Sequence, residues 1–355
     1  MKVMFYINHL GHGGAERVMV NLAKQFSENG AEVVMATSFV AENEYELSEN
    51  VRRINILSDY PRNFLTRNLR LVRCLQRIIK AEKPDVVISF MAEPNFRAVC
   101  ACLLTKTKSI ISVRNDPDKE YPNPVFRFLA KTLYRYADGV VFQTDDAKNW
   151  FPRAVGKKSR IIFNQVAEKF YNKTSTAKKN GIVTVGRLTK QKNHKALIAA
   201  YAKIADEIAD DLIIYGDGEL RDELVSYAES LGVAHRVLLP GVVDNVECVI
   251  NNAKLFVLSS DYEGMPNALM EAMALGVPSV STDCPCGGPK MLFGDDQYLV
   301  SVGDEIALAD KMLYVLKPEV AAACSLHLQA RAELFRPGVV FDAWKSFVIE
   351  VLEDK

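Results

Sequence analysis

The sequence predicts an α/β protein built from two Rossmann-like domains, and three observations support this. The chain has 355 residues, more than one ordinary core needs. Short apolar runs typical of strands alternate with amphipathic segments typical of helices. A polar stretch at 171–180, YNKTSTAKKN, has linker composition, and the alternation restarts after it. Because such alternation builds parallel sheets with right-handed crossovers, we expect two domains facing each other across a cleft.

The first domain is expected at 1–165. Its first strand, KVMFYI, leads through a glycine turn into the helix AERVMVNLAKQFSENG. Further helical patterns occur at 61–83 and around 96–104. The strand-like runs lie at 2–7, 31–37, 84–90, 109–113, 137–144 and 159–164.

The second domain is expected at 166–336. A last helix, within 337–355, follows Pro337-Gly338 and is expected to cross back onto the first domain. The strand-like runs of the second domain lie at 181–188, 211–218, 236–241, 253–260 and 277–282. Since ligands bind at the carboxyl ends of strands in such sheets, the loops after these runs are the candidate site.

The composition predicts a globular protein of the cytoplasm. Hydrophobic residues make up 49% and charged residues 25% of the chain. No apolar run approaches the roughly 18–20 residues of a membrane span. The start, MKVMFYINHL, is expected to be a strand rather than a signal peptide. The seven cysteines are therefore expected to be reduced thiols.

The charge is divided unequally between the two halves. Residues 1–165 hold 25 basic and 17 acidic side chains, whereas 166–355 hold 19 and 27. Much of the basic excess lies at 61–83, where seven basic residues accompany one acid. Two interpretations stay open for this segment: a solvated amphipathic helix packed on the sheet, or a peripheral contact with anionic lipid. No base-reading motif accompanies the charge, so nucleic acid is not favoured as a partner.

The stretch EGMPNALME at 263–271 follows a buried strand. Pro266 suits the first position of a helix and Gly276 the position just past its end, so we expect a helix at 266–275. Free N–H groups at its start would lie beside Glu263 and Gly264, which predicts a phosphate site.

The two carboxylates of this stretch are the central functional candidates. Glu263 lies on the loop, where it would face whatever the phosphate carries. Glu271 lies inside the helix, and a carboxylate there suits the vicinal diol of a ribose. Two alternatives stay open. In the first, Glu263 only interacts favourably with the helix dipole and Glu271 is an exposed helical residue. In the second, the two residues are the acid and the nucleophile of a glycosidase, whose carboxyls lie about 5–9.5 Å apart.

Two other loops carry phosphate-binding features. In VGRLTKQKNH (185–194), Arg187 and Lys192 follow the strand end at Gly186 and together suit a diphosphate, although a solvated loop is the alternative. In HLGHGGAERV (9–18), glycines separate a strand from a helix without the G-x-G-x-x-G spacing. His9 and His12 border that turn, and a plain surface histidine is the favoured interpretation of each.

We expect no metal site. Asp116-Pro117-Asp118 resembles a metal-binding acid pair, but a turn or an acceptor-binding loop is favoured. The pairs Cys100/Cys102 and Cys284/Cys286 lack a second pair at zinc-ligand spacing.

Together these motifs resemble glycosyltransferase family 4, retaining enzymes of the GT-B fold. The resemblance covers nearly the whole chain. It rests on GGAERV (13–18), VGRL-x3-K (185–192), YGDGELRDEL (215–224), LPGVVDNV (239–246) and EGMPNALMEAMALGVPSVSTD (263–283). The last of these is the most specific.

The resemblance implies roles for individual residues. Arg187 and Lys192 would hold the donor diphosphate, Glu263 would contact the transferred sugar and Glu271 would bind the ribose. Glu263, Arg187 and Lys192 are thereby the catalytic candidates. The full set of donor-binding candidates is Gly13, Gly14, Gly186, Arg187, Lys192, Val242, Val243, Glu263, Gly264, Met265, Pro266, Asn267 and Glu271, with the base near Val242 and Val243.

The sequence departs from the family pattern at three places. Many members carry a His after the strand SIISV, where this chain has Arg114, Asn115 and Asp116, which become the acceptor-side candidates. Asn164-Gln165-Val166 replaces the common Asn-Pro-Val. Lys290 replaces a common Glu.

The resemblance implies a retaining, metal-independent glycosyltransferase without a cofactor. It would move a hexose or N-acetylhexosamine from a nucleotide sugar, with UDP expected, to a saccharide acceptor. Because the basic segment at 61–83 suits docking on a membrane, a lipid-linked acceptor in cell-surface polysaccharide assembly is expected. A sugar-nucleotide-binding protein without turnover, or a glycosidase using Glu263 and Glu271, are the alternatives.

Overall fold

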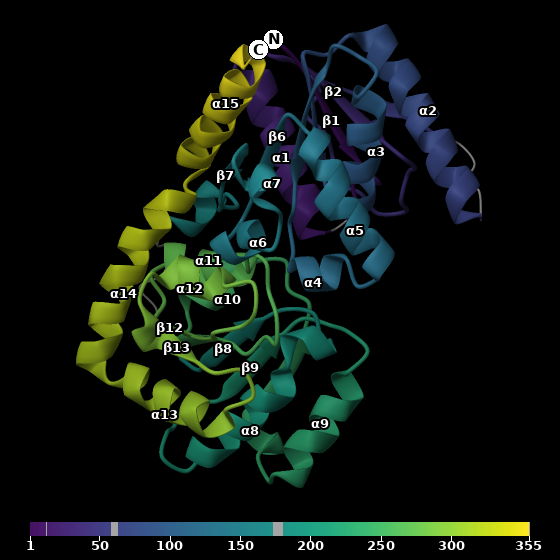
Figure 1. The fold of residues 1–355 in the computed structure, drawn as a ribbon. Helices are drawn as coiled ribbons and strands as arrows, with labels where there is room; N and C mark the ends of the chain where they lie inside the picture. Colours follow the sequence, from purple (N-terminus) through teal and green to yellow (C-terminus); the bar gives the residue numbers. More distant parts are fainter. Residues whose placement is uncertain (12, 58–62, 173–179, 355) are drawn as a thin grey trace. The chain divides into compact units, whose positions relative to one another are not determined.

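The computed structural model describes residues 1–11, 13–57, 63–172 and 180–354 (Figure 1). His12, the first two residues of the predicted 61–83 helix and most of the predicted linker at 171–180 lie outside this range. The chain forms two compact units. Unit 1 comprises Met1–Asn164 with Val340–Lys355, and unit 2 comprises Gln165–Val339.

Unit 1 contains a seven-stranded parallel sheet with the order β3-β2-β1-β4-β5-β6-β7. In the central pairs, Val3 of β1 lies opposite Val33 of β2 and Val86 of β4. The strands are β1 (Lys2–Ile7), β2 (Glu32–Thr37), β3 (Val51–Asn55), β4 (Val86–Phe90), β5 (Lys108–Ser112), β6 (Gly139–Phe142) and β7 (Ser159–Ile161). The helices are α1 (Gly14–Glu28), α2 (Phe64–Glu82), α3 (Ala92–Cys102), α4 (Pro117–Glu120), α5 (Pro124–Leu133), α6 (Asp145–Asn149), α7 (Arg153–Gly156) and α15 (Pro337–Glu353).

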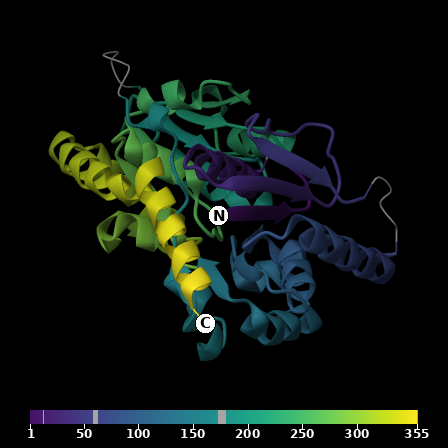
Figure 2. The ribbon, with the colours of Figure 1, turned by 90° about the horizontal axis from the view of Figure 1, so that it is seen from above.

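Both faces of this sheet are covered, which explains why its strands are apolar at nearly every position. Val3, Phe5 and Ile7 of β1 point into a core shared with α1 and α15. Met4 and Tyr6, which alternate with them, point into a second core shared with α2 and α3. Figures 1 and 2 show these two helix pairs on opposite sides of the strands.

Helix α15 belongs to the core of unit 1 although it lies at the other end of the sequence. Trp344 is fully buried, and its ring centroid lies 5.7 Å from that of Phe90 on β4. Phe341 packs edge-on against Phe26 of α1. A Cβ on Gly139 would lie 2.9 Å from Phe347, so the glycine allows the helix to lie close to β6.

Unit 2 contains a six-stranded parallel sheet with the order β10-β9-β8-β11-β12-β13. The strands are β8 (Ile182–Val185), β9 (Leu212–Tyr215), β10 (Val237–Gly241), β11 (Leu255–Leu258), β12 (Ser279–Thr282) and β13 (Leu299–Val300). The helices are α8 (His194–Ile204), α9 (Arg221–Ser230), α10 (Val246–Asn251), α11 (Asn267–Ala274), α12 (Gly288–Phe293), α13 (Glu305–Leu316) and α14 (Pro318–Ala332).

The predicted two Rossmann-like sheets are confirmed, but two edge strands were missed. β3 has the sequence VRRIN and is only partly buried. Its two arginines interrupt the apolar pattern by which a strand is predicted. β13 has only two residues, too few for any periodicity.

The strand order reverses direction at one point in each sheet, between β1 and β4 and between β8 and β11. At such a switch point the connections on either side leave toward opposite faces, and a crevice opens at the carboxyl ends of the strands. In unit 2 the loops at this crevice are those that follow β8 and β11.

We expect Trp344→Ala to lower the free energy of unfolding by about 3–5 kcal/mol, because it leaves a cavity between α15 and β4. Lys345→Ala, on the exposed face of the same helix, is expected to change it by less than about 0.5 kcal/mol. Urea unfolding followed by circular dichroism measures both. Equal stability of the two variants would show that α15 does not contribute to the core.

Candidate active site at the carboxyl ends of the strands

Lys192 and Glu263 form a buried ion pair at the switch point of unit 2. Lys192 Nζ lies 2.6 Å from Glu263 Oε1, with side-chain exposures of 17% and 8%. The buried Ser260 hydroxyl donates to the same oxygen at 2.7 Å. A candidate phosphate-binding cation and a candidate sugar-binding carboxylate are therefore in direct contact.

Hydrogen bonds tie the β8 and β11 loops to each other around this pair. The Ser259 hydroxyl donates to the Lys192 carbonyl at 3.0 Å, and Asn193 Nδ2 donates to Asp261 Oδ1 at 2.6 Å. The Asp261 amide donates to the Gln191 carbonyl at 2.8 Å. These contacts fix the position of Lys192 relative to Glu263.

Arg187 has a different environment from Lys192. Its side chain is exposed and makes no hydrogen bond or ion pair with any described residue. Its loop is held by close backbone packing, because a Cβ on Gly216 would lie 1.9 Å from the Gly186 carbonyl oxygen. Gly216 also has φ +135°, which favours glycine. The guanidinium is thus presented on a firmly held loop.

The segment after Glu263 forms a helix at 267–274, slightly shorter than predicted. Pro266 was expected at the first helical position but is the N-cap, with φ −74° and ψ 102°. Because the ψ of Pro266 is extended rather than helical, the first helical residue is Asn267. Gly276, with φ +66°, follows the helix end as predicted, and the amides of Gly276 and Val277 bond back to the last turn.

Glu271 is buried within α11, with 6% of its surface exposed. Gly264, Met265 and Pro266 are buried before the helix, whereas Asn267 is partly exposed at its start. A Cβ on Gly288 would lie 1.9 Å from the Gly264 carbonyl, so the loop after β12 packs directly on the loop after β11.

The remaining donor-side candidates in unit 2 follow β10. Val242 is 75% exposed and Val243 is partly buried. The preceding Gly241 accepts a hydrogen bond from the Gly216 amide at 2.9 Å. The ends of β8, β9 and β10 are therefore joined at the same edge of the sheet as the ion pair.

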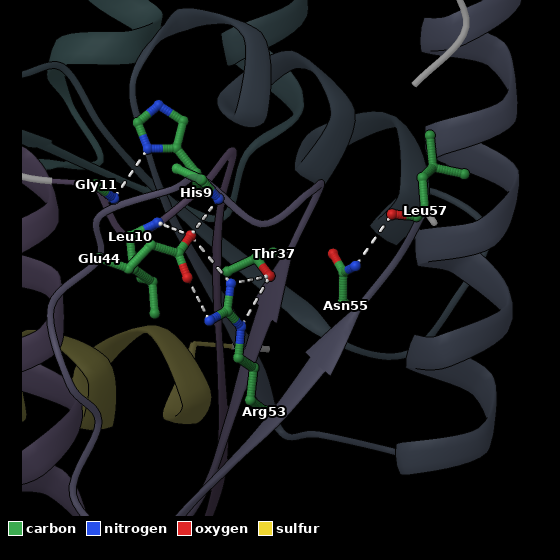
Figure 3. Close-up of polar contacts among 9 residues, drawn as sticks. His9, Leu10, Gly11, Thr37, Glu44, Arg53, Asn55 and Leu57 are labelled. Carbon is green, nitrogen blue, oxygen red and sulfur yellow. Dashed lines mark hydrogen bonds and ion pairs between the residues drawn. The ribbon is translucent and has the colours of Figure 1, made fainter. Parts of the chain in front are cut away.

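In unit 1, the glycine turn after β1 is held by Glu44 (Figure 3). Glu44 Oε1 accepts from the Leu10 amide at 3.1 Å, and Oε2 pairs with Arg53 at 2.5 Å. His9 Nδ1 accepts from the Gly11 amide at 3.0 Å. His9 is thus part of the turn rather than a surface histidine.

Helix α1 starts directly after this turn, with Gly13 as its N-cap and Gly14 as its first residue. A Cβ on Gly13 would lie 2.1 Å from a carboxylate oxygen of Glu16. Gly13 therefore accommodates the Glu16 side chain over the helix start.

The Glu44 carboxyl is strongly perturbed. Its burial alone would raise its pKa, but the hydrogen bonds from Arg53, Ala41 and Leu10 outweigh burial and lower the pKa to about 2. The carboxylate stays ionised at any pH near neutrality.

The three acceptor-side candidates all have structural contacts. Arg114 is buried, lies 4.4 Å from the Phe90 ring centroid and donates to Asn164. Burial lowers its pKa to about 9. Asn115 accepts from the Asp116 amide, and Asp116 caps α4 by accepting from the Asp118 amide at 3.0 Å. The DPD sequence therefore begins a helix.

Glu120, at the end of α4, is a buried carboxyl that the sequence did not single out. Burial raises its pKa to about 7, opposed by the nearby backbone amides of Asn115, Arg114 and Ala92. Its carboxyl faces the backbone of two of the acceptor-side candidates, Arg114 and Asn115.

Within the described ranges, no three His, Cys, Asp or Glu side chains are grouped as metal ligands. Asp118 accepts from Trp150 Nε1 at 3.1 Å and pairs with Arg127 at 3.2 Å. Cys102, Cys284 and Cys286 are buried free thiols, and Cys100 is partly buried. Lys290, the departure from the family pattern, pairs with Asp296 at 3.3 Å.

The basic segment forms helix α2, whose outer face is charged. Arg70, Arg73, Arg77 and Lys80 are exposed at helical spacing along one face. Leu65 and Leu69 are also exposed, at 71% and 59%, whereas Leu71, Leu75 and Ile79 are buried against the sheet. None of the described helices is long and apolar enough to cross a membrane.

Comparison with protein families identifies the chain. The family described as "Glycosyltransferase Family 4" matches residues 12–168, and the one described as "Glycosyl transferases group 1" matches 179–318. A Campylobacter jejuni protein is 30% identical over 363 residues, covering 99% of each chain. The chain belongs to glycosyltransferase family 4. The expected family is therefore confirmed, and with it the activity of a glycosyltransferase.

The names of two relatives of this family 4 glycosyltransferase state the reactions that those relatives catalyse. The Campylobacter protein is the "GalNAc-alpha-(1->4)-GalNAc-alpha-(1->3)-diNAcBac-PP-undecaprenol alpha-1,4-N-acetyl-D-galactosaminyltransferase". The N-acetyl-alpha-D-glucosaminyl L-malate synthase of Bacillus anthracis is 26% identical, over 96% of this chain and 95% of the relative.

Solved structures support the GT-B fold of the family 4 enzyme. Anabaena Alr3699/HepE in complex with UDP matches with a TM-score of 0.82, at 18% identity over 99% of this chain and 100% of that one. The lipopolysaccharide outer core galactosyltransferase WaaB matches with a TM-score of 0.78, at 20% identity over 99% of both chains.

Sequence reasoning did not single out Ser259, Ser260 or Glu44. The two serines were visible as hydroxyls at the end of the strand before Glu263. For Glu44 there was no local signal, since its partners Leu10 and Arg53 are brought near it only by the pairing of β1, β2 and β3.

We expect Glu44→Gln to lower the stability of the enzyme by about 1–3 kcal/mol at pH 7, because Arg53 and the turn amides lose an anionic acceptor. The pKa of Glu44 is lower in the folded than in the unfolded chain, so its stabilisation is present above about pH 4.5 and is lost as the pH falls toward 2. Thermal unfolding at pH 7, 5 and 3.5 measures the difference. Glu42→Gln, on the exposed loop beside it, is the control, and a difference independent of pH would contradict this role.

Proposed function

We propose that this enzyme is a retaining, metal-independent transferase that uses a UDP-linked hexose or N-acetylhexosamine. The observation that carries the proposal is the contact of Lys192 with Glu263 at the switch point of unit 2. Arg187 is on the same β8 loop, with its guanidinium available to an anion. Cations and a carboxylate on two adjoining loops suit a ligand with a diphosphate next to a polyol.

In the proposed donor complex, Arg187 and Lys192 bind the diphosphate together with the start of α11. Lys192 then shares its charge between phosphate and Glu263. Glu271 accepts hydrogen bonds from the ribose hydroxyls, and the base lies near Val242 and Val243. The structural similarity to HepE, which was solved in complex with UDP, supports the choice of nucleotide. The donor contacts expected of Gly13 and Gly14 in unit 1 stay predictions.

The proposed reaction breaks the bond between the anomeric carbon and the diphosphate oxygen. The two cations stabilise the negative charge that develops on that oxygen, which supports transfer without a metal. The acceptor hydroxyl attacks the oxocarbenium-like sugar on the same face, and its proton passes to the departing phosphate oxygen. Glu263 lies beside the transferred sugar and orients it.

We propose a lipid-linked saccharide as the acceptor, used in the assembly of a cell-surface glycan. The name of the Campylobacter relative, which contains PP-undecaprenol, supports a lipid-linked substrate. The exposed basic face of α2, with Leu65 and Leu69 near its start, suits a surface of anionic lipid. Reaction on the cytoplasmic side is supported by seven free thiols.

Membership in a glycosyltransferase family favours transfer over the glycosidase alternative. Glu263 is also held by a lysine and a serine, an arrangement that a hydrolase does not require. A protein that binds a nucleotide sugar without turnover differs from the proposal in one measurable respect, the release of UDP.

We expect Glu263→Ala to lower kcat by at least about 100-fold, and Glu271→Ala to raise KM for the donor by about 10- to 100-fold. Release of UDP from UDP-N-acetylglucosamine and UDP-N-acetylgalactosamine, with a crude bacterial lipid extract as acceptor, measures both. Glu229→Ala, an exposed carboxylate on α9, is the control. Undiminished turnover by both site variants would refute their roles, and loss of activity in EDTA would refute metal independence.

We expect replacement of Arg70, Arg73 and Arg77 by Gln to weaken binding to anionic vesicles by about 100-fold, at roughly 1 kcal/mol for each charge. Sedimentation with phosphatidylglycerol vesicles at two salt concentrations measures this. The matched control replaces Lys106, Lys157 and Lys345, three exposed lysines of the same unit on other elements. Equal loss in both triple variants would argue for unspecific attraction and against a docking face on α2.

A further inference from the structure

The carboxylate of Glu263 is not free to turn, because one of its two oxygens is fully occupied. Oε1 accepts from Lys192 Nζ at 2.6 Å and from Ser260 Oγ at 2.7 Å. A carboxylate oxygen has two lone pairs, so these two donors use its capacity in the carboxylate plane. No described residue donates to Oε2.

The serine that makes this contact is itself firmly held. Ser260 is fully buried and lies two residues after the end of β11. Its carbonyl accepts from the Thr282 hydroxyl at 2.6 Å, which ties it to the end of the neighbouring strand β12. Strands β11 and β12 are paired along Phe256–Leu258, so this bond anchors Ser260 to the neighbouring strand just beyond the paired residues.

We infer that Ser260 is a positioning residue, which fixes Glu263 so that Oε2 is the oxygen that meets a hydroxyl of the transferred sugar. This inference rests on the proposed function and adds to it the atom that contacts the sugar and the residue that aims it. Lys192 cannot do this alone, since its flexible side chain is also needed by the diphosphate. Since Lys192 divides its charge between phosphate and Glu263 in the proposed complex, Ser260 is the donor to Oε1 that serves Glu263 alone.

A hydroxyl group is well suited to the position of Ser260 beside Glu263 Oε1. A serine donates one hydrogen bond without adding charge, so it orients the carboxylate and leaves its negative charge for the sugar. A second cation in this position would compete with Lys192 for the same oxygen. Preorganisation of this kind avoids a reorientation during the reaction.

We expect Ser260→Ala to lower kcat by about 10- to 100-fold, the loss of one hydrogen bond to a charged group. The affinity for UDP alone, measured by calorimetry, is expected to change by less than about twofold, because UDP lacks the sugar. The assay is UDP release from the two UDP-N-acetylhexosamines named above. Ser279→Ala is the matched control, since Ser279 is equally buried on β12 but donates only to the Val277 carbonyl.

A double-mutant cycle separates positioning from a general effect on folding. If Ser260 acts through Glu263, Ser260→Ala lowers turnover in the wild-type background and has no further effect in a Glu263→Ala background, where the acceptor of its hydrogen bond is gone. Additive losses would overturn the inference, as would a Ser260→Ala variant as active as Ser279→Ala. Should Ser260→Ala fail to fold, Ser260→Cys, similar in size but a weak donor, enters the same comparison.

The outcome for the wild type distinguishes this inference from the function on which it rests. Wild-type UDP release with unchanged turnover in Ser260→Ala rejects the role of Ser260 alone. No UDP release by the wild type from either donor rejects the proposed donor chemistry and the role of Ser260 together.

Discussion

The carboxyl ends of all strands in a parallel sheet lie at one edge, and this constraint places the loops of the candidate site in unit 2 side by side. The loops after β8, β11 and β12 come from distant parts of the sequence, yet their backbones are in contact. Glycines make this packing feasible, since a Cβ at Gly216 or Gly288 would collide with a neighbouring carbonyl. The site is therefore built mainly on backbone geometry, and the charged side chains are added to a rigid frame.

Burying the ion pair of Lys192 and Glu263 costs desolvation free energy. Removing two charges from water is unfavourable, and their attraction offsets this only when further hydrogen bonds satisfy them. Ser260 donates to Glu263, and Ser259 holds the backbone of Lys192. A buried pair of this kind is weak evidence for a contribution to folding, which agrees with the ligand-binding role that we propose for it.

In unit 1, too, buried polar contacts hold the loops at the carboxyl edge of the sheet. Arg97 is almost completely buried at the carboxyl edge of its sheet and donates to Asn8 at 2.6 Å and to Asn68 at 2.6 Å, with Glu93 as its ion-pair partner. It thereby links β1, α2 and α3. Glu44 and Arg53 fix the glycine turn nearby. Polar networks at this edge, rather than apolar packing, define the shape of the loops, whereas the two apolar cores define the sheet.

The sequence by itself determined the fold class, eleven of the strands, the end of the 267–274 helix at Gly276 and the family. These follow from local patterns: apolar runs, helical spacing, turn glycines and short motifs. It did not reveal β3 or β13, because edge strands are partly polar or too short to show periodicity. It also misplaced Pro266, since proline suits both the cap and the first helical position.

Only the tertiary structure decided which side chains meet. Lys192 and Glu263 are 71 positions apart, and nothing in either loop alone indicates that they touch. The same holds for Glu44, whose partners Leu10 and Arg53 come together through the pairing of β1, β2 and β3. The return of helix α15 to the first unit was expected, but its partners Phe26 and Phe90 were not. The physical reason is that secondary structure depends on neighbouring residues, whereas contacts between loops depend on the order in which the strands pair.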